Sequence, residues 1–248
     1  MQYQGSKKRL SKTLKPFIEQ YIKSDSIYVE PFMGGCNMLT EIDAKIKYGY
    51  DYNEYVVEFF KALQNNSFYP PDFIDKETYD KIKKDKEYQD NNKPLTAWVA
   101  LGCSFGAKWF GGYAKDVTKA GKSRQMIARN GLDKQIPKLK NIIFNYSSYD
   151  DIEIQENMVV YCDPPYADTL KYKDDFDSEK FWDWVLEKSE ICPILISEYK
   201  KHSNEKYSDI IPIFTKDVNC AMDECSNRTE KLFIHKKWVK NDSNSKQY

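Results

Sequence analysis

The chain has 248 residues, of which 41% are hydrophobic and 15% aromatic, and its formal net charge is zero. This composition is sufficient for a buried core, which excludes a disordered protein, and the length suits one large domain or one domain with a sizeable insertion. No apolar run is long enough to cross a membrane, and the N-terminal stretch MQYQGSKKRL has no apolar signal region, so we expect a cytoplasmic protein.

The first part of the chain predicts alternating strands and helices. A helix is expected over 8–23, a short buried strand over 26–30, a helix over 37–48, a strand over 48–51 and a helix over 53–63. Such a βαβ pattern is typical of a parallel sheet that binds ligands at the carboxyl ends of its strands.

The alternation stops between residues 69 and 140, where charged helical stretches surround a glycine-aromatic loop, GAKWFGGY. Residues 107–140 carry nine lysines and arginines against two aspartates, a net charge of +7, whereas residues 150–190 are acidic. A charged block alone is usually a solvated face, but a basic third beside an acidic third points to a nucleic-acid surface. We therefore predict a mainly helical insertion at 67–140, inside a catalytic domain formed by 1–66 and 141–240 and followed by a flexible tail at 241–248.

Regular elements return after the insertion. Strands are expected over 141–145, 158–162 and 192–197, a helix over 178–188, and a closing pair of strands over 210–214 and 231–235. The predicted fold class is α/β.

Six cysteines and two histidines show no spacing typical of metal ligands. We expect neither a metal site nor a disulfide framework, and we assign no catalytic role to Cys162, His202 or His235.

Two short stretches suggest a nucleotide-type ligand. Gly34 and Gly35 follow the first strand, where the backbone can approach a ligand closely, although an ordinary turn would read the same. Asp51 ends the second strand; it could bind ribose hydroxyls or cap the following helix, and the glycine loop favours the ribose.

The stretch NMVVYCDPPYAD carries the strongest signal. Asp163 ends a strand, and two prolines fix the Pro164 carbonyl and the Tyr166 ring relative to its carboxylate. A flat base with an amino group could donate to both acceptors and stack on the ring, so this reading is favoured over a simple capped turn.

Together, the DPPY stretch, EPFMGG, GYDYN and the N-terminal YQGSKKRL resemble the Dam-type (class alpha, D12) DNA adenine-N6 methyltransferases. The four blocks cover nearly the whole chain and occur in that family's order. The resemblance implies a Rossmann-like methyltransferase fold with a mixed seven-stranded sheet, S-adenosylmethionine as cofactor, and an inserted DNA-recognition domain. The loop Phe32-Met-Gly-Gly-Cys36 departs from the common F-x-G-x-G form, and Gly5-Ser6 from a common Gly-Gly pair.

The resemblance also implies site residues. The catalytic residues are Asp163, Pro164, Pro165 and Tyr166. The cofactor-binding residues, which also include Asp163, are Tyr3, Gly5, Ser6, Lys7, Glu30, Pro31, Phe32, Gly34, Gly35, Asp51, Tyr52, Tyr149 and Asp150. No covalent intermediate is needed for this chemistry.

The basic insertion supplies the predicted DNA contacts, which are Lys108, Trp109, Tyr113, Lys119, Lys122, Arg124 and Arg129. For Trp109 and Phe110, packing in the core of the insertion is an equal alternative. We expect an enzyme that flips adenine out of double-stranded DNA and acts as a monomer, or as a transient dimer on DNA. The alternatives are an RNA adenine-N6 methyltransferase and a catalytically silent DNA-binding module; the related amide-methylating class usually has Asn where this chain has Asp163.

Overall fold

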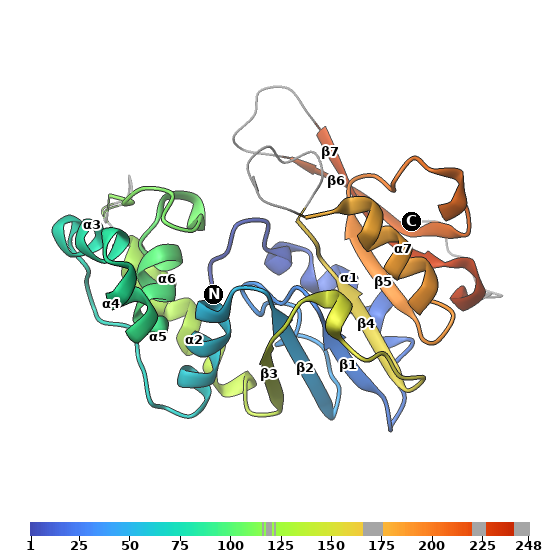
Figure 1. Ribbon diagram of the computed structural model, residues 1–248, viewed down its shortest axis with the longest axis horizontal. Helices are drawn as coiled ribbons and strands as arrows, with labels where there is room; N and C mark the ends of the chain where they lie inside the picture. Colours follow the sequence, from blue (N-terminus) through green and yellow to red (C-terminus); the bar gives the residue numbers. More distant parts are fainter. Residues whose placement is uncertain (116, 118–120, 122, 166–175, 220–226, 241–248) are drawn as a thin grey trace.

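The computed structural model describes residues 1–115, 117, 121, 123–165, 176–219 and 227–240. Its centre is a seven-stranded sheet in the order β3-β2-β1-β4-β5-β7-β6 (Figure 1). Strands β1 to β5 are parallel, and β7 pairs antiparallel with both β5 and β6. The strands are β1 Ile27–Glu30, β2 Ile46–Asp51, β3 Ile142–Tyr146, β4 Met158–Cys162, β5 Ile194–Glu198, β6 Ile210–Asn219 and β7 Asn227–His235. The mixed seven-stranded sheet of the predicted fold is confirmed.

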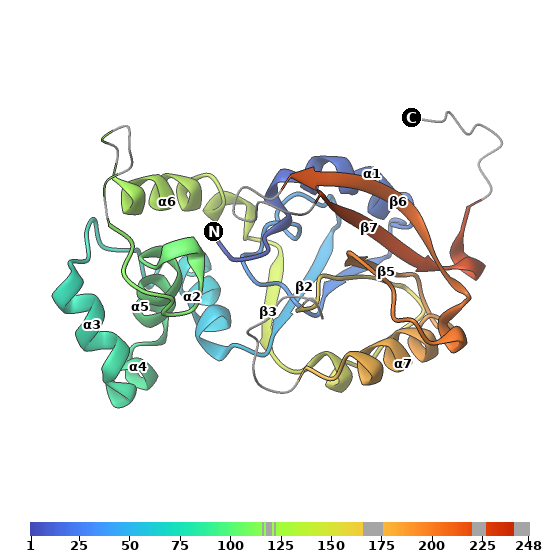
Figure 2. The ribbon, with the colours of Figure 1, turned by 90° about the horizontal axis from the view of Figure 1, so that it is seen from above.

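Helices cover both faces of this sheet. In Figure 2, α1 (Ser11–Glu19) and α7 (Ser178–Lys188) lie on opposite faces, with the strands between them. Alternation along the central strands explains this: Tyr28 belongs to the hydrophobic cluster that contains α1, while its neighbour Val29 belongs to the cluster that contains α7. Strands buried on both faces read as continuous apolar runs, as MVVYC does in β4, which is buried throughout.

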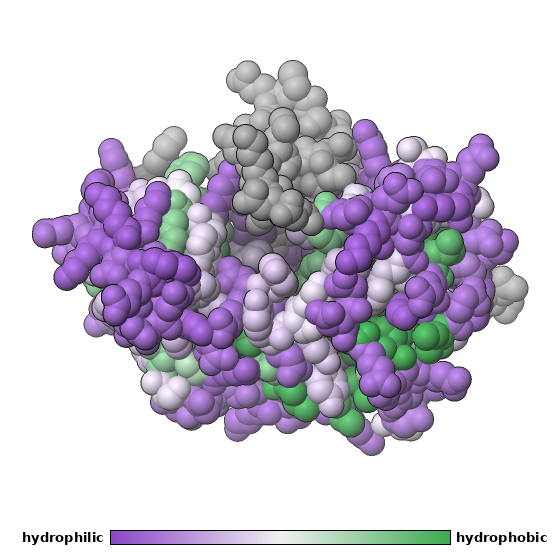
Figure 3. All heavy atoms as spheres, viewed as in Figure 1, coloured by the Kyte–Doolittle hydropathy of each residue, from purple (hydrophilic) through white to green (hydrophobic). Residues whose placement is uncertain are grey.

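The helices between β2 and β3 gather at one side of the sheet, beyond β3 (Figure 1). They comprise α2 Glu54–Gln64, α3 Lys76–Lys84, α4 Lys86–Asn91, α5 Lys93–Ala97 and α6 Arg124–Asp133, with a π-helical turn at Trp98–Gly102. Trp98 is fully buried and joins the hydrophobic cluster that contains α2. The surface over α3 and α4 is hydrophilic almost throughout (Figure 3), as their lysine-rich sequences require. The boundaries proposed for an inserted domain stay a prediction.

The prediction of a helix over 37–48 is wrong. Residues 34–41 form successive turns, Cys36 has a φ of 57°, and β2 already begins at Ile46. Three carbonyls of these turns accept from side chains outside them: Gln135 Nε2 donates to the oxygens of Gly35 (3.0 Å) and Cys36 (2.9 Å), and Lys47 Nζ donates to that of Leu39 (2.8 Å). Tertiary hydrogen bonds therefore override the local helical spacing.

The other elements agree with the sequence to within a few residues at each end. The first helix is shorter, and it is preceded by the 3₁₀ turn η1 at Lys7–Arg9. The closing strands are longer than expected, and α7 has the predicted bounds with Asp177 as its N-cap. The remaining 3₁₀ turns are η3 Phe105–Ala107, η4 Ile136–Lys138, η5 Tyr149–Asp151, η6 Glu205–Tyr207 and η7 Lys236–Trp238. In the described part of the chain, no helix has the length and apolar character that a membrane span requires.

Candidate active site

A cleft of about 1160 Å³ opens where the strand order reverses, outside the carboxyl ends of β1 and β4. Ligands of open α/β sheets bind at such a switch point. Almost all of the predicted catalytic and cofactor-binding residues line it: Tyr3, Gly5, Ser6, Lys7, Glu30, Pro31, Phe32, Gly34, Gly35, Asp51, Tyr52, Tyr149, Asp150, Asp163, Pro164 and Pro165. Tyr166 lies outside the described residues.

The glycine loop is packed against the N-terminal segment. Gly34 has a φ of +44°, and a Cβ there would lie 3.0 Å from the Tyr3 ring. A Cβ at Gly35 would lie 2.6 Å from Asn37 Nδ2 and 2.8 Å from Tyr3 Cβ. Both positions therefore require glycine, which brings a bare backbone to the wall of the cleft.

Asp51 links this loop to the start of α2. Its Oδ2 accepts a hydrogen bond from Gly34 N (2.9 Å), and its Oδ1 accepts one from Asn53 N (2.9 Å). Burial raises the pKa of Asp51 to about 6, although these two hydrogen bonds lower it. The cap of α2 is Asn53, whose side chain accepts from Tyr55 N, so the alternative of Asp51 as the N-cap is excluded. Each carboxylate oxygen has a second lone pair that can accept from a ligand.

Aromatic rings form another wall. Phe32, at the end of β1, lies 5.5 Å from the Tyr149 ring and 5.8 Å from Phe176, centroid to centroid. Tyr149 in turn packs edge-on against Phe181 and Trp184 of α7. Next to it, the hydrogen bond from Lys180 lowers the pKa of Asp150. A flat apolar group could lie on this wall with an acceptor nearby.

The structure pairs Asp163 with Lys7, a contact that the sequence did not predict. Lys7 Nζ lies 2.8 Å from Asp163 Oδ1, and the exposed fractions of the two side chains are 6% and 21%. Burial alone would lower the pKa of Lys7, but the carboxylates of Asp163 and Glu230 outweigh it and the pKa is raised. The lysine therefore stays cationic and favours the ionised form of the carboxylate.

Several acidic groups around this pair were not predicted. Glu230 on β7 and Glu198 at the end of β5 are both buried. Burial raises the pKa of Glu198 to about 8. Burial also holds the pKa of the predicted residue Glu30 well above its usual range, although Tyr28 donates a hydrogen bond of 2.8 Å to Glu30. An acid at a strand end, such as Glu198, could have been found from the sequence, but nothing local to Glu230 indicates a site.

The predicted DNA-binding residues that the structure describes differ in exposure and in their contacts. Trp109 lines the cleft, 37% exposed, with its ring 5.3 Å from that of Tyr55. Phe110 packs against the hydrophobic core, which agrees with the packing alternative for this residue, and the DNA contact of Trp109 stays a prediction. Tyr113 is half-buried and donates to the Ile74 carbonyl (2.8 Å), whereas Lys108 is exposed.

The two arginines of α6 also differ. Arg124 is exposed at the start of the helix. Arg129 is paired with Asp72 and lies over the Tyr69 ring. Lys119 and Lys122 are outside the described residues.

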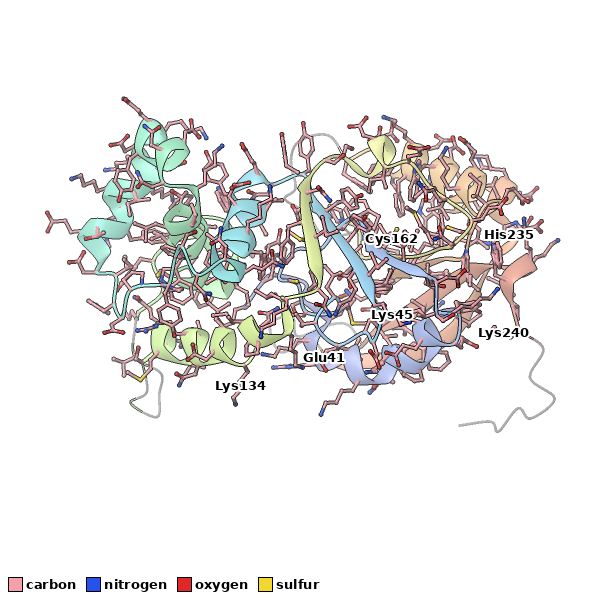
Figure 4. All side chains as sticks on the ribbon, turned by 90° about the horizontal axis from the view of Figure 1, so that it is seen from below. Glu41, Lys45, Lys134, Cys162, His235 and Lys240 are labelled. Carbon is pink, nitrogen blue, oxygen red and sulfur yellow. The ribbon has the colours of Figure 1, made fainter. Side chains whose placement is uncertain are left out.

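No group of three or more His, Cys, Asp or Glu side chains within the described ranges could hold a metal ion. Cys36, Cys103, Cys162 and Cys192 are buried. Figure 4 shows Cys162 inside the layers on β4 and His235 at the end of β7, while Lys134 of the α6 region points away from the body. The side chains and backbone that line the cleft are those described above: carboxylates, a lysine, carbonyls and aromatic rings.

The sheet order, the antiparallel β7 and a cleft at the β1/β4 switch point define a Rossmann-like methyltransferase fold. A sequence model of the D12 class N6 adenine-specific DNA methyltransferase family matches residues 3–96 and 107–205. The chain belongs to this family.

Solved structures of other methyltransferases resemble the chain at low sequence identity. An rRNA methylase from Streptococcus thermophilus is 9% identical, with a TM-score of 0.40, and the match covers 90% of this chain and 94% of that one. The tRNA (m1A58) methyltransferase TrmI from Aquifex aeolicus is also 9% identical, with a TM-score of 0.38, covering 91% of this chain and 68% of that one.

Proposed function

We propose that this protein is a site-specific DNA methyltransferase that uses S-adenosylmethionine to methylate the N6 amino group of adenine in duplex DNA. The observation that carries the proposal is the position of Asp163 and Pro164. They follow β4 beside the end of β1, in the same cleft as the glycine loop and Asp51. The family match names this chemistry, and the cleft contains acceptors suited to it.

The residues of the cleft fit S-adenosylmethionine. Asp51 would accept the ribose hydroxyls, and the wall of Phe32 and Tyr149 would hold the adenine ring of the cofactor. The bare backbone of Gly34 and Gly35, next to Tyr3, leaves room for the amino-acid end. When bound, S-adenosylmethionine supplies a methyl group on a positively charged sulfur.

Asp163 and the Pro164 carbonyl would act on the target adenine. An aromatic amino nitrogen is a poor nucleophile because its lone pair is delocalised into the ring. If its two protons are held by these acceptors, the nitrogen becomes more tetrahedral and its lone pair points at the methyl carbon. Transfer would form the N–C bond at the expense of the cofactor's C–S bond, and Asp163 would take the proton that the nitrogen loses and pass it to water. Holding the reactants in line can contribute about 7–11 kcal/mol in favourable cases.

The target base must leave the duplex to reach these groups, because an adenine in the base stack is inaccessible to a recessed cleft. Unstacking costs a few kcal/mol. Exposed basic residues such as Lys108 and Arg124 would bind the phosphates that position the duplex.

The direct test is methyl transfer from labelled S-adenosylmethionine to unmethylated plasmid DNA, followed by nucleoside analysis. We expect N6-methyladenine at a defined sequence. Methylation of RNA alone would favour the RNA alternative, and DNA binding without transfer to either nucleic acid would favour the silent module.

Replacing Asp163 tests the mechanism. We expect Asp163→Asn and Asp163→Ala to lower the transfer rate about 10²–10³-fold, the usual cost of a transition-state hydrogen bond, while cofactor affinity changes little. The exposed Asp25→Asn is the matched control and should retain full activity. Retained activity in both Asp163 variants would remove this residue from the mechanism.

A further inference from the structure

We infer that Glu230 is a positioning residue for methyl transfer: through Lys7, it sets how strongly Asp163 accepts the target amino group. The inference rests on the proposed function and extends it to a residue outside the cleft. Glu230 is not among the residues that line the cleft, so any influence on the reaction must pass through a neighbour.

Lys7 is that neighbour, because its ammonium lies near two carboxylates, one directly after β4 and one on β7. Nζ is 2.8 Å from Asp163 Oδ1 and 3.8 Å from Glu230 Oε1, and it also donates to the Gly5 carbonyl at 3.3 Å. Its N–H groups donate to Asp163 Oδ1 and to the Gly5 carbonyl, while Glu230, at ion-pair distance, shares the single positive charge with Asp163. The charge of Lys7 is therefore shared between the residue proposed to bind adenine and a residue behind it.

Glu230 is more deeply buried than Asp163. Its side chain is only 4% exposed, and Oε1 accepts a hydrogen bond of 2.7 Å from Ser197 Oγ. Ser197 is fully buried in β5, and the antiparallel register of β5 with β7 (Ser197↔Leu232, Glu198↔Lys231) fixes the two strands. Such a buried carboxylate needs a cationic partner, and Lys7 is a cation within ion-pair distance of it.

This sharing affects the acceptor strength of Asp163. A lysine paired with Asp163 alone would draw electron density from the carboxylate that must receive the adenine amino protons. Glu230 draws part of that ammonium charge toward β7, which leaves Asp163 the stronger acceptor. Without the negative charge of Glu230, Lys7 would bind Asp163 more tightly, and the reaction would slow although both substrates still bind.

The test compares wild-type full-length protein with variants in which Glu230 is changed in charge or in length. Single-turnover experiments measure the rate of methyl transfer, and steady-state kinetics measure KM. In Glu230→Gln, which keeps an acceptor for Ser197, we expect the rate to fall about tenfold, less than the loss of a whole charged hydrogen bond, with KM for DNA and S-adenosylmethionine within about twofold. Glu230→Asp keeps the charge and should recover to within about threefold of wild type. Ser197→Ala keeps the charge of Glu230 but removes the hydrogen bond that holds its side chain, so its transfer rate should lie between those of the two Glu230 variants.

Glu205→Gln, an exposed glutamate on η6, is the matched control and should match wild type. Thermal unfolding of each variant separates loss of fold from loss of rate. An unchanged rate in Glu230→Gln overturns the inference, as does an equal loss in Glu230→Asp or a loss confined to KM. The wild-type transfer rate is measured first, so a protein without methyl-transfer activity would refute the proposed function rather than the role of Glu230.

Discussion

The Asp51 carboxylate is partly buried at the wall of the cleft, and the two backbone hydrogen bonds that it accepts do not fully offset its desolvation. Its pKa is therefore raised to about 6, so the ionised form dominates above that pH and the protonated form below it. Ribose hydroxyls donate best to the ionised form. We predict that S-adenosylmethionine binds about tenfold more weakly at pH 5 than at pH 8, measured by titration calorimetry.

The control for this prediction is Asp51→Asn, which has the same shape but no titratable group. Its affinity should be lower than that of wild type at pH 8 and nearly constant down to pH 5. A wild-type affinity that does not change over this range would mean that Asp51 does not bind the cofactor in its ionised form.

Among the individual residues in and behind the cleft, the sequence predicted some and missed others for a physical reason. Asp51 and Asp163 could be predicted because one ends and the other directly follows a parallel strand, and such ends meet at one edge of the sheet, whereas Glu30 was predicted from the family resemblance. The contact between Lys7 and Asp163 joins residues 156 positions apart, and Glu230 comes from an antiparallel strand. No local spacing encodes such pairs.

Among the elements, the turns at 34–41 depend most on distant contacts. Gln135, which is 6% exposed, donates to the Gly35 and Cys36 carbonyls and accepts from the Met1 amino group. We predict that Gln135→Ala lowers the free energy of unfolding by about 1–3 kcal/mol, because the hydrogen bonds of this buried amide are lost together. Urea unfolding would measure this, with the exposed Gln155→Ala as a control. A change below about 0.5 kcal/mol at Gln135 would contradict this role.

The same contacts explain which elements the sequence could predict. β4 and α7 were predicted with their observed bounds, because an apolar run and a spaced aromatic face are local signals. Residues 37–48 carry a helical spacing too, but Gln135 and Lys47 bind the carbonyls that a helix would need. The prediction of secondary structure failed where side chains, one of them about a hundred residues away, supply the hydrogen bonds.

For the whole molecule, the charge distribution matters more than the net charge of zero, because a duplex meets only one surface. The basic block of 107–140 was predicted from the sequence, but the sequence could not show which of its cations are already paired. Arg129 is engaged by Asp72 and the Tyr69 ring and is 20% exposed, whereas Arg124 is exposed and has no ion pair among the described residues.

We therefore predict different effects for the two arginines of α6. Arg124→Gln should weaken DNA binding and reduce the slope of log K against log salt by about 0.9, the value for one phosphate contact on duplex DNA. Arg129→Gln should leave that slope nearly unchanged and instead lower the stability by up to about 1 kcal/mol, because it loses an ion pair and a ring contact. Fluorescence anisotropy over a salt series and thermal unfolding measure the two quantities on the same samples. If Arg129→Gln reduces the slope while Arg124→Gln does not, the phosphate contact lies at Arg129, and the pairing with Asp72 must open when DNA binds.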